Sequence, residues 1–422
     1  MDAAVPRIAI VGGGPAGLMA AQILSRKNFT VTLYEAKASF GRKFLLAGRG
    51  GLNLTHSETI EQFLKRYGPN LDFFRGKISH FSPNDLRAWS DDLGVPTFVG
   101  SSGRVFPTSL KASPLLRAWL VRLRDQGVVL KPEHRLTKLA ISRGQSPSRS
   151  ITLDLLDQNG ARLEDAADAV LLALGGASWP RMGSDGRWLE HLKAMGVACA
   201  DFQPSNCGFD VQWSEIFAQR HAGTALKNLL LKTDAAQARG EIMIARYGVE
   251  GGGIYALGRT LREELKADGT ARVVLDLKPD LEQAKIAQRL ATQRPKDSLS
   301  SRLRKSIKLS PAATALIREC VPADSLTTPD LIAQAVKAVP LTLTASQSLE
   351  RAISSTGGVQ IEGLSQDLMI KSLPGVFAAG EMLDWDAPTG GYLLQGTIAT
   401  AVCAAEGVER WMLRNSNGSL NS

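Results

Sequence analysis

Three glycines near the N-terminus have the spacing of a dinucleotide-binding turn. Gly12, Gly14 and Gly17 follow the apolar segment RIAIV and open the small-residue segment from Ala16 to Leu24. In such a turn the first glycine permits a tight bend, the second lets the backbone approach a pyrophosphate, and the third allows close helix–sheet packing. The helix N-terminus then offers N–H groups to the phosphates. The motif alone is weak, but a strand before it and a helix after it are what its chemistry requires.

Charged residues follow this turn at positions suited to a dinucleotide. Glu35 ends the next apolar segment, where an acidic side chain accepts hydrogen bonds from the adenosine ribose and disfavours a 2′-phosphate. Arg42 and Lys43, in the segment GRKF, are expected beside the pyrophosphate. The other contacts expected at this end of the cofactor come from Pro15, Ala16 and Ala36.

Two later strand–glycine segments decide between FAD and NAD. VLLALGGASWP contains Gly175 and Gly176, and GVFAAGEMLD contains Gly380 and Glu381. FAD is long and extended, so it needs several strand ends, and a late acidic residue suits its ribityl chain. A simple NAD domain does not need this C-terminal return, and the sequence therefore predicts FAD. The further residues expected to contact it are Gly50, Leu136, Asp384, Gly391, Tyr392 and Leu393.

The segment TGGYLLQG, residues 389–396, opens an alanine-rich helix. Its free N–H groups could face the pyrimidine edge of the flavin and stabilise the anionic reduced form. Ordinary capping by Thr389 is compatible with that role. Another glycine-rich segment, YGVEGGGIYALG at 247–258, lacks the flanking strand and acidic residue of a dinucleotide site. We therefore expect no separate NAD(P)H domain, and NAD(P)H is a candidate electron donor that docks without one.

The segment LLAGRGGLNLTHSE, residues 45–58, is predicted to form the wall beside the flavin ring, because its glycines permit close backbone approach. Residue types that orient a substrate or move a proton occur here and again near residue 250. The catalytic candidates are Arg49, Asn53, His56, Arg246 and Glu250, with Tyr247 as a further residue to test. Each has a structural alternative: His56 could cap the following helix, Arg246 could be a surface ion pair, and Tyr247 could be core.

The order of these segments predicts an α/β fold. A Rossmann-type, glutathione-reductase-like FAD-binding domain is split in sequence by an inserted domain with a β-rich and a helical part. The expected boundaries are 1–190 and 346–412 for the two parts of the FAD domain, 191–258 for the β-rich insertion, 259–345 for the helical insertion, and 413–422 for a disordered tail.

Composition describes an ordinary globular protein, with 422 residues, 44% hydrophobic and 22% charged. No apolar run approaches the roughly 20 residues that span a bilayer, and no signal peptide is recognised, so a cytoplasmic location without membrane contact is expected. Four cysteines are scattered and five histidines have no ligand-like spacing, which argues against disulfides, a redox dithiol and a metal site.

Basic residues form two clusters within a chain of net charge +9. One lies between residues 101 and 150, and the other includes Arg289, Arg294, Lys296, Arg302, Arg304, Lys305 and Lys308. These clusters are either solvated helix faces or a surface for nucleic acid, so RNA is a candidate partner. The sequence does not indicate an oligomeric state.

Taken together, these motifs resemble the BaiN-like flavoprotein family, also called YhiN- or RdsA-like, among the glutathione-reductase-type FAD proteins. The segments GRKFLLAGRGGLNLTH, STGGV and AGEMLDWDAPTGGYLLQG carry the resemblance, which covers almost the whole chain. Some positions depart from the usual family pattern. Leu52 replaces a cysteine, His56 replaces an asparagine, and an arginine has moved to position 49. Such changes suggest a subfamily with an altered substrate.

The resemblance implies an FAD-dependent oxidoreductase that transfers hydride through the flavin N(5). Members have been linked to amine oxidation, to reduction of steroid double bonds, and to forming dihydrouridine in ribosomal RNA. Reduction of uracil in RNA is the first specific hypothesis. A small-molecule flavin oxidase or reductase and an RNA-binding flavoprotein without turnover are the alternatives.

Overall fold

The computed structural model describes residues 5–48, 50–141, 151–294 and 296–418, which form two compact units. The first unit combines Met1–Gln203 with Ser355–Ser422, and the second is Pro204–Ser354. Each unit has its own hydrophobic core. The chain therefore leaves the first unit once and returns to it once, as a split domain with an insertion requires.

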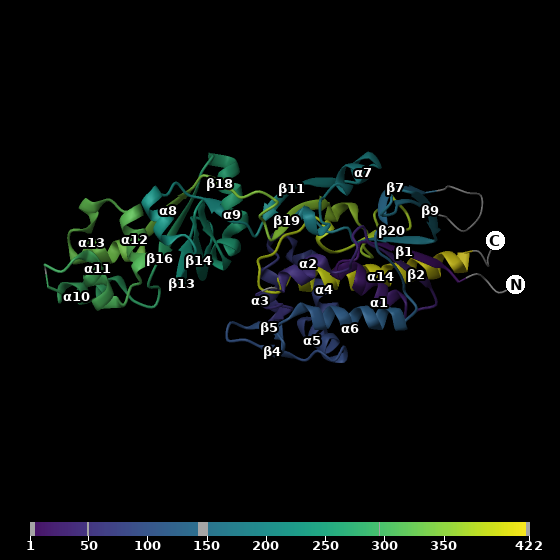
Figure 1. Cartoon of the computed structure of the whole chain (residues 1–422), viewed down its shortest axis with the longest axis horizontal. Helices are drawn as coiled ribbons and strands as arrows, with labels where there is room; N and C mark the ends of the chain where they lie inside the picture. The colour runs from purple at the N-terminus through teal and green to yellow at the C-terminus, as the bar shows by residue number, and fades with distance from the viewer. Residues whose placement is uncertain (1–4, 49, 142–150, 295, 419–422) are drawn as a thin grey trace. The chain divides into compact units, whose positions relative to one another are not determined.

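A parallel sheet of five strands is the centre of the first unit (Figure 1). Strand β10 has the sequence AVLL and is buried at all four positions, which is typical of a parallel strand covered on both faces. The strand order is β20-β10-β1-β2-β6, so β10 lies beside β1 and β20, the last strand of the chain, lies beside β10. The bounds are Arg7–Val11 (β1), Thr30–Tyr34 (β2), Val129–Lys131 (β6), Ala169–Leu172 (β10) and Val376–Ala378 (β20).

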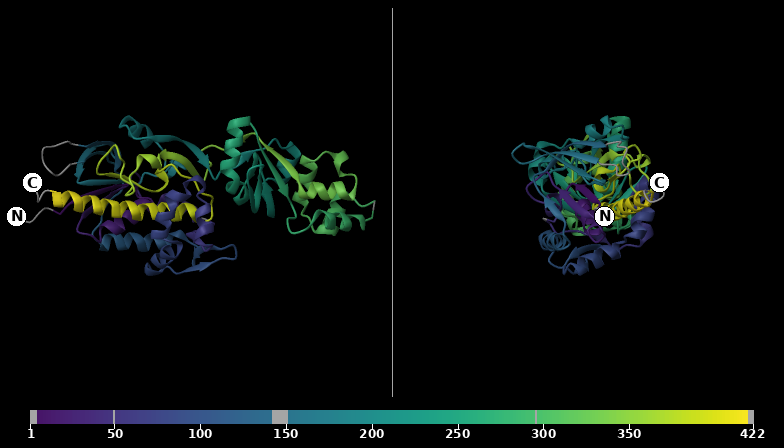
Figure 2. Two further views of the ribbon diagram at one scale, coloured as in Figure 1. Left: turned by 180° about the vertical axis from the view of Figure 1, so that it is seen from behind. Right: turned by 90° about the vertical axis from the view of Figure 1, so that its right-hand side faces the viewer.

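Helices α1 (Pro15–Leu24) and α14 (Tyr392–Gly418) pack against each other. They lie side by side in Figure 1 and in the left view of Figure 2. Their close approach follows from buried alanines on both helices. Helix α6 (Ala112–Asp125) contacts α1 as well. The other helices of this unit are α2 (Arg42–Ala47), α3 (Ile60–Lys65), η1 (Gly68–Asn70), α4 (Leu71–His80), α5 (Pro83–Asp92), η2 (Pro180–Met182), α7 (Trp188–Ala194), η4 (Ile361–Gly363) and η5 (Gly380–Met382).

Small sheets flank this core. Strands β3 (Thr55–His56), β5 (Arg104–Pro107) and β4 (Thr97–Val99) form one antiparallel sheet. A second contains β7 (Arg135–Ile141), β8 (Ile151–Leu156) and β9 (Arg162–Ala167). At the two chain crossings, β11 (Cys199–Ser205) pairs with β19 (Ser354–Val359).

The second unit is built on a seven-stranded sheet of order β17-β16-β13-β14-β15-β12-β18, with antiparallel pairing. Its strands are β12 (Phe209–Asp210), β13 (Thr224–Lys232), β14 (Gln237–Ala245), β15 (Gly248–Glu250), β16 (Ala271–Asp276), β17 (Val339–Leu343) and β18 (Ala345–Ser346). Its helices are α8 (Glu215–His221), α9 (Gly252–Asp268), α10 (Gln283–Ala291), α11 (Leu299–Ile307), α12 (Pro311–Cys320), η3 (Ala323–Leu326) and α13 (Pro329–Lys337).

The insertion differs from the expected division into a β-rich and a helical part. Strands β16 and β17 come from the segment 259–345 that was expected to be helical, and they extend the same sheet as β13 and β14. The cause is visible in the segment VPLTL, whose side chains alternate between buried and exposed as in a half-buried strand. One compact unit over 204–354 therefore replaces two parts over 191–345.

The C-terminal boundary also differs. Helix α14 continues to Gly418, beyond residue 412, where a disordered tail was expected to begin. The last turns of α14 are polar, and a polar sequence alone does not indicate a helix. They are helical because buried residues earlier in α14 anchor the helix, which then extends into solvent. Within the described ranges, no helix is long and apolar enough to cross a membrane.

Candidate functional site

The glycine turn after β1 has the backbone that phosphate binding requires. Gly12 has φ +111°, and a Cβ on it would lie 2.1 Å from the carbonyl oxygen of Ala173. A Cβ on Gly17 would lie 1.9 Å from the carbonyl oxygen of Gly12. Gly14, by contrast, has open space where its Cβ would be, in front of the N-terminus of α1. This space at a helix N-terminus can hold a pyrophosphate.

The first hydrogen bond within α1 runs from the Leu18 N–H to the Gly14 carbonyl, at 3.0 Å. Pro15 stands at the first position of the helix, where its missing N–H leaves no donor unpaired. The N–H groups of Ala16 and Gly17 precede that first bond. They are the donors available to an anion here.

Glu35 is fixed at the end of β2. Its carboxylate accepts hydrogen bonds from the N–H groups of Gly13 and Lys37, both at 2.8 Å. Burial raises the pKa of Glu35, and these two hydrogen bonds oppose that shift. A carboxylate has about four lone-pair positions, so Glu35 keeps acceptor capacity for ribose hydroxyls. Ala36 follows it directly in the chain.

Lys43 and Glu381 form an ion pair across the site. The Lys43 Nζ lies 2.6 Å from the Glu381 Oε2 and 2.6 Å from the Ser178 Oγ. Glu381 also accepts a hydrogen bond from the Ser355 N–H at 3.2 Å. Gly176 belongs to the same cluster, because a Cβ on it would lie 2.1 Å from the Ser355 Oγ. Segments 338 residues apart thus supply opposite charges to one place.

The residues present fit a bound FAD. The Nε of Arg42 is buried with no hydrogen-bond partner, although Arg42 also donates to Ser39 at 3.4 Å. An unpaired guanidinium nitrogen at the start of α2 suits a phosphate oxygen. Gly14 and Gly50 both have open space at their Cβ positions. Within the described ranges, no group of His, Cys, Asp and Glu could hold a metal ion.

Other residues expected to contact FAD have structural partners in the first unit. Gly380 has φ +82° and receives the Trp385 indole N–H on its carbonyl at 2.9 Å. Gly175 receives the Trp188 indole in the same way at 3.0 Å. Asp384 accepts the Gly357 N–H at 2.9 Å. Leu136 and Leu393 are both half-buried, in β7 and α14 respectively.

The loop between α2 and β3 is held against its neighbours. Leu52, at the position of the family cysteine, is 1% exposed and belongs to the core, so no reactive group occupies that point. The Oδ1 of Asn53 and the Oγ1 of Thr55 are buried without a hydrogen-bond partner. These two acceptors are available to a donor that the protein itself does not supply. Arg49 lies outside the described residues.

His56 belongs to a cluster built around Tyr392. The two rings stack with centroids 5.5 Å apart, and the Tyr392 hydroxyl donates to Glu58 Oε1 at 2.6 Å. Arg66 holds both oxygens of Glu58, at 3.1 and 2.8 Å. Tyr67 donates to the Tyr392 carbonyl at 2.9 Å. We call Tyr392, His56, Glu58 and Arg66 the Tyr392 cluster.

The ring nitrogens of His56 both have local partners. The Nδ1 accepts the Glu58 N–H at 3.1 Å, so the Nε2 carries the proton and donates to the Ser102 carbonyl at 3.0 Å. His56 does not cap α3, whose N-cap is Thr59, but bonds the backbone just before that helix. The cluster also fixes the start of α14, where a Cβ on Gly391 would lie 2.5 Å from the Thr55 Cα.

The remaining catalytic candidates lie in the second unit, at the turn between β14 and β15. Arg246 is exposed, and the Tyr247 hydroxyl donates to Glu250 Oε2 at 2.5 Å. Burial and the hydrogen bond to Glu250 raise the Tyr247 pKa strongly. Arg351 lies over the Tyr247 ring, 5.6 Å from its centroid. Tyr247 and Glu250 are therefore in contact, whereas Arg246 is exposed beside them in the chain.

Some residues of these arrangements escaped the sequence interpretation. Ser178, which contacts Lys43, follows the second glycine pair in GGASWP, and its place in that motif was a usable signal. No sequence signal marked Glu58 and Arg66, because the residues around them have the pattern of an ordinary helix start.

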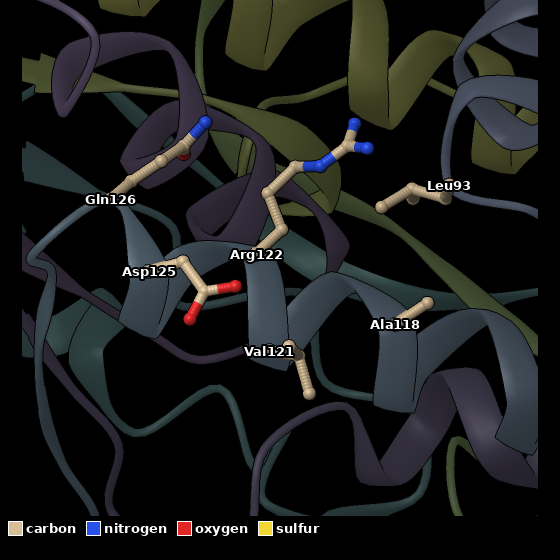
Figure 3. Close-up of a pocket in the computed structure, with 6 residues that line it drawn as sticks. All are labelled: Leu93, Ala118, Val121, Arg122, Asp125 and Gln126. Atoms are coloured by element: carbon tan, nitrogen blue, oxygen red, sulfur yellow. The ribbon is translucent and has the colours of Figure 1, made fainter.

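A pocket on the surface of α6 is lined by Leu93, Ala118, Val121, Arg122, Asp125 and Gln126 (Figure 3). It contains no residue of the predicted site.

Comparison with known proteins agrees with the fold. Residues 6–407 match the family model described as HI0933-like protein Rossmann domain. The 3-dehydro-bile acid delta(4,6)-reductase of Clostridium scindens is 28% identical over 94% of this chain and 98% of that protein. A ribosomal RNA dihydrouridine synthase of Haemophilus influenzae is 19% identical over 95% of this chain and 98% of that protein.

Two solved structures share the fold at low identity. One is the 3-ketosteroid delta1-dehydrogenase of Sterolibacterium denitrificans, with TM-score 0.52 and 12% identity over 96% of this chain and 99% of that one. The other is a flavocytochrome c3 fumarate reductase, with TM-score 0.51 and 14% identity over 97% of this chain and 78% of that one. The predicted α/β fold with an FAD-binding Rossmann domain and an inserted unit is confirmed.

Proposed function

Because the chain belongs to the HI0933-like family and is an FAD-dependent oxidoreductase, we propose that it reduces a ring C=C bond conjugated to a carbonyl group. Uracil in ribosomal RNA is the first substrate we propose. Bound FAD supplies hydride transfer through its N(5). In the net reaction one carbon of the double bond gains a hydride, its neighbour gains a proton, and the electron pair comes from a donor of the NAD(P)H class.

One observation carries this proposal. The bile acid reductase and the dihydrouridine synthase, which each match nearly the whole chain, are named for the same kind of bond change. A dihydrouridine is a uridine whose ring C=C has been reduced, and a delta(4,6)-reductase of a 3-dehydro compound reduces double bonds in conjugation with a ketone. We therefore propose the same reaction for this chain, the flavin-dependent reduction of a C=C bond conjugated to a carbonyl group.

The chain's own residues would divide the work along FAD. The α1 N-terminus, Arg42 and Lys43 bind the pyrophosphate, and Glu35 binds the adenosine ribose. Glu381, which pairs with Lys43, would accept hydrogen bonds from the ribityl hydroxyls. The first turn of α14, held by the Tyr392 cluster, offers N–H groups to the pyrimidine end.

A small-molecule substrate is the second candidate. It is favoured by the higher identity to the bile acid reductase, 28% against 19% for the RNA enzyme. The two substrates present the same electronic feature to the flavin, so the FAD contacts cannot separate them. The difference must arise in the residues that recognise the rest of the substrate.

The deciding experiment reduces purified holoprotein anaerobically with NADH or NADPH and then adds one acceptor. Unmodified ribosomal RNA transcript and a 3-oxo-4,6-diene steroid are the two acceptors. Flavin reoxidation by RNA, with dihydrouridine found by mass spectrometry of the digested RNA, supports the first proposal. Reoxidation by the steroid alone supports the second. Reoxidation by neither, combined with rapid peroxide formation in air, would identify an oxidase and refute both.

A further inference from the structure

Most of the excess positive charge of this protein lies in one short segment of the second unit. Residues 285–308 contain eight Lys or Arg and a single acidic residue, Asp297, which gives a net charge of +7. The whole chain has +9, so the other 398 residues contribute only +2. Such concentration is the electrostatic footprint of a polyanion site rather than of general solubility.

The structure presents this segment as a helical hairpin. Helix α10 (Gln283–Ala291) and helix α11 (Leu299–Ile307) are joined by a polar connection, and the two helices pack together. The apolar side chains of both helices, including Leu290, Leu303 and Ile307, are buried in the core of the unit. We call residues 283–308 the basic hairpin.

Six of the eight cations of the basic hairpin are exposed, and one of these six has an ion pair among the described residues. Arg294 and Lys296 are exposed in the connection, Arg304 is exposed on α11, and Lys308 is exposed directly after the end of α11. Lys305 pairs with Asp297 at 2.8 Å, and this is the one ion pair of the hairpin among the described residues. Together with Lys285 in α10, five exposed cations of the hairpin thus have no ion pair among the described residues.

The surroundings favour RNA over the other polyanions. A membrane-binding helix needs a free apolar face beside its cations. Every large apolar side chain found exposed in the described residues lies outside 283–308. The side chains of Thr292, Gln293 and Ser298 bond within the hairpin, so the exposed cations are the groups that it offers to a partner. Arginine and lysine side chains dominate contacts to a nucleic-acid backbone.

We infer that the basic hairpin is an RNA-backbone docking surface that recruits the polynucleotide through Arg294, Lys296, Arg304 and Lys308. The inference rests on the proposed function, since it names how an RNA substrate would be held. The contacts are to phosphate and carry no sequence information. Selection of one uridine therefore falls to the flavin site, and the hairpin contributes affinity and speed of association.

The test compares two quadruple charge-reversal variants of the full-length holoprotein. The first replaces Arg294, Lys296, Arg304 and Lys308 with Glu. The control replaces four exposed cations of the same unit outside the hairpin, Lys227, Lys232, Lys266 and Arg272. Binding of ribosomal RNA transcript is measured by filter retention across a salt series, with flavin content and circular dichroism recorded for both. A variant with Gln at the four hairpin positions checks that loss of positive charge, rather than added repulsion, is responsible.

We expect the hairpin variant to bind RNA at least about 10-fold more weakly than the control, and the slope of log affinity against log salt to become shallower by up to about 3. Unchanged affinity and slope in the hairpin variant would overturn the inference. Binding of wild type to anionic vesicles but not to RNA would overturn it as well. Dihydrouridine formation is scored separately. Hairpin-dependent binding without dihydrouridine would refute the proposed reaction alone, and dihydrouridine formed equally by both variants would refute the docking surface alone.

Discussion

Removing the Tyr392 hydroxyl should loosen the start of α14. Tyr392→Phe deletes a hydrogen bond of 2.6 Å to the carboxylate of Glu58, and both groups are shielded, with 4% exposure for Tyr392 and 15% for the Glu58 side chain. Hydrogen bonds to charged groups contribute about 1.5–3 kcal/mol. Because Arg66 still holds Glu58, the carboxylate is not left alone, and we expect the lower end, about 1.5 kcal/mol.

The assay is a double-mutant cycle with Glu58→Gln, read as the free energy of unfolding in urea at a fixed, saturating FAD concentration. A phenyl ring at position 392 has no hydroxyl to bond the carboxylate at position 58, so we expect a coupling energy of about 1–1.5 kcal/mol between the two sites. Glu61→Gln is the control, because it changes an exposed carboxylate of α3 for which the described part of the chain shows no ion pair. This variant should stay within about 0.5 kcal/mol of wild type.

The pH dependence of this coupling has a definite sign. Burial alone would raise the pKa of Glu58, but the hydrogen bonds from Arg66 and Tyr392 outweigh it and lower the pKa. Burial and the bond to Glu58 raise the pKa of Tyr392 well above its usual range. A carboxylate with a lowered folded pKa stabilises fully above its unfolded pKa, about 4.3, and this is lost as the pH falls through the folded value. The coupling should therefore be constant from about pH 5 to 9. A coupling near zero, or one that fades between about pH 7 and 5, would refute the reasoning.

Two further substitutions test the FAD site. Gly12→Ala places a Cβ 2.1 Å from the Ala173 carbonyl oxygen at a φ of +111°, so the purified protein should lose its bound flavin, measured by absorbance. The control Gly76→Ala has open space around its Cβ and should retain the flavin. Lys43→Met removes the cation from Glu381 and from the pyrophosphate, and FAD affinity measured by fluorescence titration should fall by roughly 10-fold or more. An unchanged FAD affinity would remove Lys43 from the cofactor site.

The parts that sequence alone predicted are those encoded by neighbouring residues. The strand, glycine turn and helix of residues 7–24 need only local spacing, because the φ of Gly12 and the packing of Gly17 are properties of one turn. The same holds for the family motifs near Gly391. Strands β16 and β17 were missed because each is short and lies among helices, although the alternation in β17 was present in the sequence.

The Tyr392 cluster could not have been predicted in this way. Its hydroxyl–carboxylate contact joins residues 334 positions apart, and no local pattern marks Glu58 as the acceptor. The Lys43–Glu381 pair is similar, although each residue had been assigned to the cofactor separately. The spacing of residues in the sequence predicts their positions along one helix or strand. Which residues of distant segments meet across a site depends on how the sheet brings its strand ends together.

Within this fold, cofactor binding and substrate choice depend on different residues. The groups that fit FAD lie at strand ends and helix starts of the first unit. Two departures from the family pattern, Leu52 and His56, lie in the segment GRKFLLAGRGGLNLTH, which also supplies Arg42 and Lys43. Leu52 fills core, and His56 is committed to the Tyr392 cluster. We expect substrate recognition to depend on residues whose polar groups are unpaired or exposed, namely Asn53 and Thr55 in the first unit and Arg246 in the second.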